Sequence, residues 1–228
     1  SDELAKYSVE TILDYSVEGK TEEGDFDHTV NEIMATILEA EKNPNIPFAV
    51  FKVTGICSIE VLEKTNASAD NMDEIIHSLY SDLIARVDKI CSAAFESNIP
   101  LFVDAEESWI QNSIDRIVRE MSFKYNKSKA IIYNTAQLYR HDRLSFIQVE
   151  INDARSRGYF IGMKLVRGAY MEKERERAQK LGYPSPIHDT KENCDKDFNN
   201  ALTLMLRNND VASLCAGTHN EESCAFLV

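Results

Sequence analysis

Short β-rich runs and longer amphipathic segments alternate along most of this 228-residue chain. The β-rich runs cover residues 48–55, 101–106, 129–135, 159–168 and 211–218. Apolar residues that recur every three or four positions predict helices over 108–121, 143–158, 170–182 and 194–209, and another helix begins near 220. Repeated strand–helix units of this kind form right-handed crossovers on a parallel sheet.

The first 47 residues have a different character, because no strongly β-rich run interrupts them. Residues 26–43 predict a helix, with one apolar face made by Val30, Ile33, Met34, Ile37 and Leu38. We therefore expect an N-terminal helical segment over 1–47 and a strand–helix domain over 48–228. Between the first two strands, the spacing predicts one long helix from about Ala69 to Ser97.

Two architectures contain such alternating units, the doubly wound open sheet and the (β/α)₈ barrel. A dinucleotide-binding open sheet requires a glycine fingerprint after its first strand, and "KVTGICS" at 52–58 lacks that spacing. A barrel instead carries functional side chains at the carboxyl ends of several strands, and this chain has charged or polar residues at such positions. The sequence favours an α/β fold of the (β/α)₈ TIM-barrel type. Because five strands are predicted and a barrel has eight, we expect an incomplete barrel whose last strands lie beyond Val228.

Composition narrows the class of protein. The net charge is −13, which argues against nucleic acid as a partner because phosphate binding requires a basic surface. No apolar run is long enough for a transmembrane helix, and the first residues show no secretory signal, so a cytoplasmic location is expected. The five cysteines include no pair at CxxC spacing, so the sequence predicts no metal site.

Charged and polar residues stand where most of the predicted strands end. Lys52 interrupts the first strand and Asp104 ends the second; a buried ammonium requires a partner, so we expect these two to pair. The remaining strand-end residues are Gln137 after the third strand, Lys164 and Arg167 on the fourth, and Thr218 and His219 after the fifth.

The fourth strand has the most distinctive end. Lys164 and Arg167 are three residues apart and point to opposite faces of a regular strand, one into the barrel and one at its rim. Gly168 and Ala169 follow and let backbone N–H groups approach a ligand closely. Cations and exposed amides near a helix start suit an anion or an electron-rich cofactor.

Other acidic residues near these strand ends have a simpler interpretation. Glu106 and Glu107 are expected to favour the start of the helix that follows, or to be solvated. The run "EKERER" at 172–177 is expected to form a solvated helix face with ion pairs inside the helix. These residues alone predict a barrel-type enzyme with an anionic ligand or cofactor. Two alternatives stay open: a Schiff-base lyase or aldolase that uses Lys164, and an inactive barrel fragment that associates through open sheet edges.

Five motifs in order resemble the proline dehydrogenase (proline oxidase) family. They are "FKVTG" at 51–55, "VDAEES" at 103–108, "NTAQLY" at 134–139, "MKLVRGAY" at 163–170 and "GTHNEES" at 217–223, and "ILDYSVEG" at 12–19 and "GYPSPI" at 182–187 also match. The resemblance implies a distorted barrel that holds FAD and oxidises L-proline to Δ1-pyrroline-5-carboxylate. It further implies electron transfer to a quinone, peripheral association with the inner face of a membrane, and a mitochondrial location in a eukaryote. It leaves the oligomeric state open, and a hydroxyproline-preferring relative is an alternative.

The resemblance also implies roles for individual residues. Lys52 matches the lysine that binds the substrate carboxylate, and Asp104 matches the active-site aspartate that pairs with it. Lys164 stands where many bacterial members have an arginine beside the reactive nitrogen of the flavin. The remaining positions that match cofactor-binding segments are Ala105, Gln137, Arg167, Gly168, Ala169, Thr190, Lys191, Thr218 and His219. A paired-arginine motif that grips the substrate carboxylate in the family is absent before Val228, so we expect this polypeptide alone to bind proline poorly.

Overall fold

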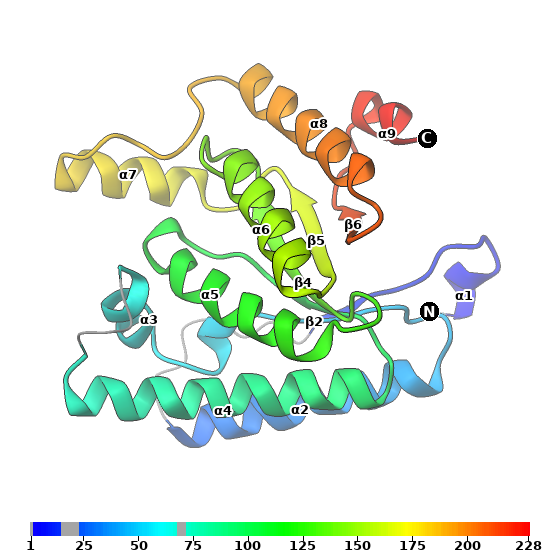
Figure 1. The fold of residues 1–228 in the computed structure, drawn as a ribbon, viewed down its shortest axis with the longest axis horizontal. Helices are drawn as coiled ribbons and strands as arrows, with labels where there is room; N and C mark the ends of the chain where they lie inside the picture. The colour runs from blue at the N-terminus through cyan, green and yellow to red at the C-terminus, as the bar shows by residue number, and fades with distance from the viewer. Residues whose placement is uncertain (1, 15–22, 68–71) are drawn as a thin grey trace.

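The computed structural model describes residues 2–14, 23–67 and 72–228, and they form one parallel sheet with helices packed around it (Figure 1). The strands lie in the order of the sequence, each paired in parallel with the next. They are β1 Leu13–Asp14, β2 Ala49–Phe51, β3 Leu101–Val103, β4 Ile132–Gln137, β5 Ile161–Val166 and β6 Ala212–Ala216. A parallel sheet in sequence order with helical crossovers confirms the (β/α)-barrel class.

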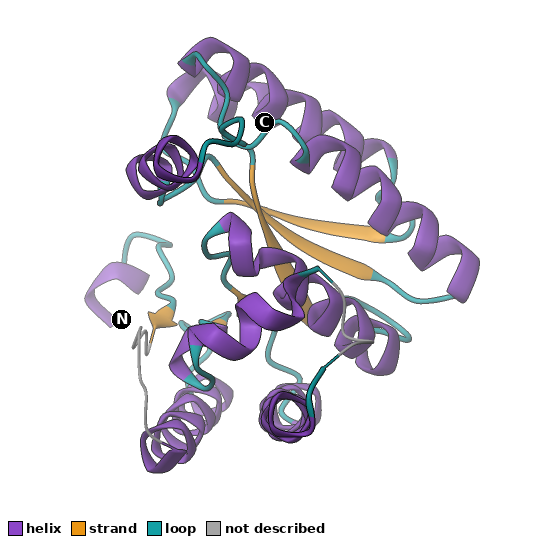
Figure 2. Ribbon diagram, turned by 90° about the vertical axis from the view of Figure 1, so that its left-hand side faces the viewer, coloured by secondary structure: helices purple, strands orange, loops and turns teal. Residues whose placement is uncertain are grey.

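The helices surround the strands, which fan through the centre of the molecule in Figure 2. The two long helices α2 and α4 lie side by side along one edge (Figure 1). The helical elements are α1 Asp2–Ala5, α2 Glu23–Lys42, the 3₁₀ turn η1 Val53–Gly55, α3 Ile59–Asn66, α4 Glu74–Glu96, α5 Ser108–Tyr125, α6 Arg143–Arg157, α7 Met171–Leu181, α8 Lys191–Arg207 and α9 Glu221–Leu227. No helix among the described residues has both the length and the apolar character needed to cross a bilayer.

The structure corrects the expected elements near the N-terminus. All five predicted strands are present, but β1 adds a sixth within the segment expected to be helical, because a two-residue strand leaves no periodic signal. The turn η1 and helix α3 also lie ahead of the expected long helix. The expected start of that helix at Ala69 lies outside the described residues; α4 begins after Asp73, whose carboxylate accepts from the Ile76 amide at 2.8 Å.

The strand register arranges inward-facing side chains in layers. Phe102 on β3 is opposite Tyr133 on β4, which is opposite Gly162 on β5. The Phe102 ring stacks on Phe48 with centroids 4.3 Å apart, and the Tyr133 ring meets both edge-on. A Cβ at Gly162 would lie 2.3 Å from the Tyr133 ring, so only glycine admits that ring. This aromatic layer fills the lower barrel interior.

Two residues further along each strand, the next layer changes from aromatic to charged. Thr135 on β4 is opposite Lys164 on β5, and Lys164 is opposite Cys215 on β6. Extending the β2–β3 register by one residue past Phe51 and Val103 places Lys52 opposite Asp104. Because side chains alternate along a strand, these residues face the same side as the aromatic layer. The sheet therefore presents its charges directly above an apolar floor.

Candidate functional site

A cavity of about 820 Å³ opens at the carboxyl ends of the strands. A pocket at this end of a parallel barrel is where ligands bind in such folds. It gathers most of the site residues expected from sequence: Lys52, Asp104, Ala105, Gln137, Lys164, Arg167, Gly168, Ala169, Lys191, Thr218 and His219. The expected residues thus converge on one place from five different strands.

Lys164 and Asp104 form the central ion pair of the cavity. Nζ of Lys164 lies 2.6 Å from Oδ1 of Asp104, and both side chains keep about a fifth of their surface exposed. The ammonium also sits 5.1 Å above the Phe102 ring of the aromatic floor. The expectation had been that Lys52 pairs with Asp104. The structure gives Asp104 a different cation, Lys164, which reaches it from β5 across the intervening strand β4.

Lys52 lines the same cavity from the end of β2. It is half-buried and occupies the N-cap position of the turn η1, with extended backbone angles and no side-chain cap hydrogen bond. An ammonium has no acceptor and cannot cap a helical turn, so the amides of η1 need acceptors from elsewhere.

Glu106 corrects a second expectation. It is only 2% exposed, and its Oε1 accepts from the Thr54 amide at 3.0 Å while its Oε2 accepts from the Thr54 hydroxyl. Burial raises the pKa of this carboxyl to about 7, against the opposing effect of the Thr54 hydrogen bonds. Glu107 is also buried, and its carboxylate pairs with Lys173 at 2.9 Å. Neither carboxylate is solvated, although Glu107 does stand at the N-cap position of α5, as the helix-start interpretation expects.

Gln137 connects the cavity wall to the loop after β5. Its amide nitrogen donates to the Glu106 carbonyl at 2.8 Å, and its amide oxygen accepts from the Ala169 N–H at 2.9 Å. The side chain is 3% exposed. Gln137 therefore holds the Gly168–Ala169 backbone in place at the rim.

Arg167 fastens the rim to the last two helices. Its guanidinium donates to Asp195 at 2.6 Å, to Thr218 at 2.8 Å and to Ser223 at 3.0 Å. It thus faces α8 and α9 while Lys164 points into the barrel, as their three-residue spacing predicts. The guanidinium is held rigidly with its positive charge beside the cavity.

Gly168 lies where the chain turns from β5 toward α7, and its φ of +144° is accessible to glycine rather than to residues with a side chain. A Cβ there would also lie 2.5 Å from the Tyr139 ring. Both restrictions confirm that the chain at this point requires glycine. They account for the small residue in the strand-end motif.

Thr190, another residue expected at the site, lies outside the cavity lining. Its hydroxyl oxygen caps α8 by accepting from the Asn193 amide at 3.2 Å, and it is not among the residues that line the cavity. Its neighbour Lys191 lines the cavity and pairs with Asp195. Helix α8 therefore contributes Lys191, the residue after its N-cap, to the cavity lining.

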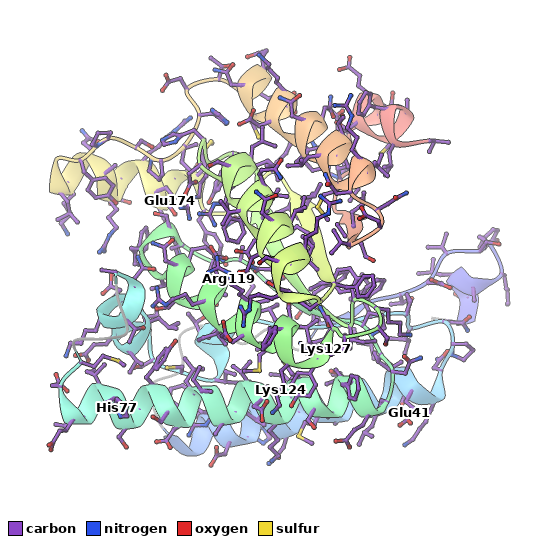
Figure 3. All side chains as sticks on the ribbon, in the orientation of Figure 1. Glu41, His77, Arg119, Lys124, Lys127 and Glu174 are labelled. Atoms are coloured by element: carbon purple, nitrogen blue, oxygen red, sulfur yellow. The ribbon has the colours of Figure 1, made fainter. Side chains whose placement is uncertain are left out.

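The charged run 172–177 is solvated as expected at Glu172, Lys173, Arg175 and Glu176, but not throughout. Glu174 is fully buried, and its carboxylate accepts from the amide and the hydroxyl of Ser108, each at 2.6 Å. Figure 3 places Glu174 between α7 and the start of α5. Lys173 and Arg177 pair with Glu107 and Glu63 on other elements. The run therefore fastens α7 to the neighbouring helices.

Sequence reasoning missed several lining residues. Thr135, Val166 and Gly217 belong to the inward faces of their strands, and Asn220, Glu221 and Glu222 lie at the start of α9. The signal was available for the first set, because Thr135 and Val166 are two residues from Gln137 and Lys164, each on the same strand. Tyr170 also lines the cavity and is nearly buried.

A family model described as "Proline dehydrogenase" matches residues 1–228, the whole chain. This chain belongs to the proline dehydrogenase family. The motif resemblance seen in the sequence is thereby confirmed, and residues from five of those motifs or their neighbours line the cavity described above.

Two curated relatives match almost the whole of this chain. "Proline dehydrogenase 1, mitochondrial" of Dictyostelium discoideum is 31% identical over 98% of this chain and 46% of its own length. "Carbapenem antibiotics biosynthesis protein CarD" of Pectobacterium carotovorum is 30% identical over 99% of this chain and 58% of its own length. The chain thus spans about half the length of these relatives.

A solved structure shares the fold. Proline utilization A (PutA) from Bdellovibrio bacteriovorus, inactivated by N-propargylglycine, superposes with a TM-score of 0.83 over 99% of this chain and 24% of its own. The sequence identity is 17%. At that identity the match supports the barrel fold of the proline dehydrogenase domain.

Proposed function

We propose that the protein containing this chain oxidises L-proline to Δ1-pyrroline-5-carboxylate, the first step of proline catabolism. Membership of the proline dehydrogenase family over residues 1–228 supports the reaction. The single structural observation that carries the proposal is the cavity in which Lys52, Asp104 and Lys164 face one space at the strand ends. The substrate is small and zwitterionic, and such a cavity supplies charge of both signs.

FAD is the cofactor we propose for this cavity. Its volume of about 820 Å³ lies within the range of ligand pockets, and the exposed backbone at Gly168 and Ala169 allows close approach. The cations Lys164, Arg167 and Lys191 suit an isoalloxazine that becomes anionic on reduction and a pyrophosphate. Ala105, Gln137, Thr218 and His219 would hold other parts of the cofactor. When bound, FAD supplies the acceptor for a hydride.

The residues of this chain would orient the substrate and hold its charge. Lys52 would bind the proline carboxylate through a charge-assisted hydrogen bond. Asp104 would hold the Lys164 ammonium in place, so that its charge faces the reacting end of the site. The amine must be neutral before hydride loss from its neighbouring carbon, and the product is an imine with two electrons fewer.

The alternative Schiff-base chemistry receives less support from the same contacts. Lys164 is engaged by Asp104 at 2.6 Å, whereas a Schiff-base lysine attacks as a neutral, available amine. A carbonyl substrate trapped on the protein by borohydride would favour that reading.

The electron acceptor and the location are proposals drawn from relatives. A quinone would accept the electrons, with peripheral association at a membrane. Several relatives carry the name "Proline dehydrogenase 1, mitochondrial", which supports a mitochondrial location if the source is eukaryotic. In a bacterium the corresponding place is the cytoplasmic face of the membrane.

A second substrate is favoured by one specific relative. "Hydroxyproline dehydrogenase" of Xenopus laevis is 30% identical over 75% of this chain. The ring hydroxyl of hydroxyproline would require a polar partner in the pocket. A pocket without such a partner would discriminate against the hydroxylated substrate.

Turnover of the intact protein tests these proposals. The protein loaded with FAD is assayed with a dye acceptor and either L-proline or 4-hydroxy-L-proline, and the cyclic imine product is trapped with an aromatic amino-aldehyde. Higher kcat/KM for L-proline supports the first proposal, and higher kcat/KM for hydroxyproline supports the second. Turnover of neither substrate by a protein that retains FAD contradicts both.

A further inference from the structure

The 3₁₀ turn that follows β2 is capped by a residue from another strand. Lys52 is the N-cap residue of η1, a position usually held by Ser, Thr, Asp or Asn so that a side-chain oxygen can accept from the N2 or N3 amide. Here Thr54 is at N2, and its amide donates to Oε1 of Glu106. Glu106 lies 52 residues away in the sequence. The cap is therefore supplied by the end of β3.

The strand register explains how Glu106 reaches the turn. The Asp104 amide donates to the Phe51 carbonyl at 3.0 Å, which carries the β2–β3 pairing past the last strand residue. Two residues beyond Lys52 and two beyond Asp104 come Thr54 and Glu106, which meet through two hydrogen bonds. Lys52 and Asp104 both line the cavity, whereas Thr54 and Glu106 are buried and do not line it.

The backbone and carboxylate of Glu106 are both held. Its amide donates to Oε1 of Gln111 at 2.8 Å, and its carbonyl accepts from Gln137. Gln111 donates in turn to Asp115, whose other oxygen pairs with the buried Arg143 at 2.7 Å. Because the side chains around Glu106 are themselves hydrogen-bonded, its carboxylate is held in place and in turn fixes Thr54.

We propose that Glu106 is a positioning residue: by capping the turn η1 through Thr54, it holds the Lys52 ammonium at the cavity in the place that receives the substrate carboxylate. The proposal rests on the function proposed above for Lys52. A carboxylate or hydroxyl at position 52 would cap the turn locally and leave no cation for the ligand. Supplying the cap from β3 allows position 52 to carry a lysine while the turn stays closed.

Two properties of the pair support this role over simple packing. Both Thr54 and Glu106 are 2% exposed, so a lost hydrogen bond is not replaced by water. Burial of the carboxyl is unfavourable for its charged form, and Thr54 with the positive charge of Lys52 offsets part of that cost. If this contact served packing alone, an apolar pair would fill the same space without the cost of burying a carboxyl group.

The experiment uses the intact protein loaded with FAD and a substrate-like probe with no oxidisable amine, cyclopentanecarboxylate. Its Kd is measured from the perturbation of the flavin spectrum, and pyrrolidine, which has no carboxylate, is the companion probe. The variants are Thr54→Val, Glu106→Ala and the conservative Thr54→Ser. The matched control is Thr65→Val, which removes an equally buried hydroxyl that contacts Ser113 at 2.6 Å, among residues that do not line the cavity.

The proposal predicts that Thr54→Val and Glu106→Ala weaken cyclopentanecarboxylate binding by about tenfold, while FAD affinity and pyrrolidine binding change by less than about twofold. Thr54→Ser restores wild-type binding, and Thr65→Val does not alter it. Equal effects of Thr54→Val and Thr65→Val would overturn the proposal. So would parallel losses for both probes, since a merely structural defect makes no distinction between them.

Hydrogen exchange of the Thr54 amide separates this inference from the proposed function. Glu106→Ala removes the acceptor and is expected to speed exchange of that amide by about tenfold or more, with or without ligand. Unchanged exchange overturns the capping role. If the wild-type protein binds no carboxylate and is not reduced by proline, the proposed function and the role of Lys52 fail together, while exchange still decides whether Glu106 caps the turn.

Discussion

Lys164 on β5 donates to Asp104 beyond β3 across 2.6 Å, although 60 residues separate them in the sequence. The strand between them contributes Thr135, whose hydroxyl donates to the Val103 carbonyl at 2.9 Å and lies 3.5 Å from Oδ1 of Asp104. A small residue on β4 thus allows the longer side chains on either side to meet. This ion pair brings a cation and an anion together in one half-buried cavity.

Removing the charge at position 164 is expected to slow flavin reduction. Lys164→Met leaves Asp104 without its cation and removes the positive charge from the site, so the rate of reduction by L-proline falls by about 100-fold. Lys164→Arg keeps the charge and retains most of the rate. Anaerobic stopped-flow absorbance gives both rates. The control is Lys173→Met, another ion-paired lysine; a similar rate for Lys164→Met and Lys173→Met would contradict the role of Lys164.

The buried carboxyl of Glu106 is expected to give the protein a distinct pH dependence of stability. Burial raises its pKa from 4.5 to about 7, so between these values the folded state binds a proton that the unfolded state releases. The contribution of Glu106 to stability therefore falls as pH rises from about 4.5 to 7, by about 3 kcal/mol in total. Glu106→Gln removes this titration while it can still accept from the Thr54 amide and donate to its hydroxyl.

Urea unfolding at several pH values from 4.5 to 8 measures the difference between wild type and Glu106→Gln. The wild type is expected to lose stability relative to the variant as pH rises through this window. A difference that stays constant with pH, or one that changes in the opposite direction, would show that the carboxyl has no raised pKa in the folded protein.

Glu174 is expected to contribute strongly to stability despite its place in a highly charged run. Glu174→Ala leaves the amide and hydroxyl of Ser108 without their acceptor at the start of α5, at a cost of about 1–3 kcal/mol. Glu176→Ala on the exposed side of the same helix is expected to change the free energy of unfolding by less than about 0.5 kcal/mol. Equal urea midpoints for the two variants would contradict this assignment.

Gly168 is expected to be more sensitive to substitution than another glycine with positive φ. Gly168→Ala brings a Cβ against the Tyr139 ring and strains the rim, so FAD affinity is expected to fall by about tenfold or more. Gly158→Ala, at the end of α6, has φ of +68° but meets no atom within 4 Å. It is expected to lower stability by about 1 kcal/mol and leave FAD affinity unchanged. Fluorescence titration of the apoprotein with FAD distinguishes the two; equal affinities would contradict the role of the rim.

The sequence predicted five of the six described strands, and the residues at their ends, because both leave local signals. A charged residue in or after an apolar run, such as Lys52 or Lys164, is unusual enough to identify a strand end. The partners of those residues could not be predicted, because Asp104 meets Lys164 across the intervening strand β4 rather than a residue of an adjacent strand. The predictions that Glu106 and Glu174 are solvated were wrong for a related reason. Nothing local distinguishes Glu106 or Glu174 from a solvated acid, since each is satisfied by a hydroxyl and an amide that lie far away in the sequence.

Anaerobic titration of the FAD-loaded intact protein with L-proline tests the central claim most directly. The account predicts that the flavin absorbance bands bleach with L-proline, and that the reduced protein contains one imine product for each flavin reduced. Glycine and D-proline are the control additions. Glycine has the carboxylate but no ring, and D-proline has both with the opposite configuration at the α-carbon. A protein that binds FAD in this cavity and keeps its oxidised spectrum in the presence of saturating L-proline would contradict the account.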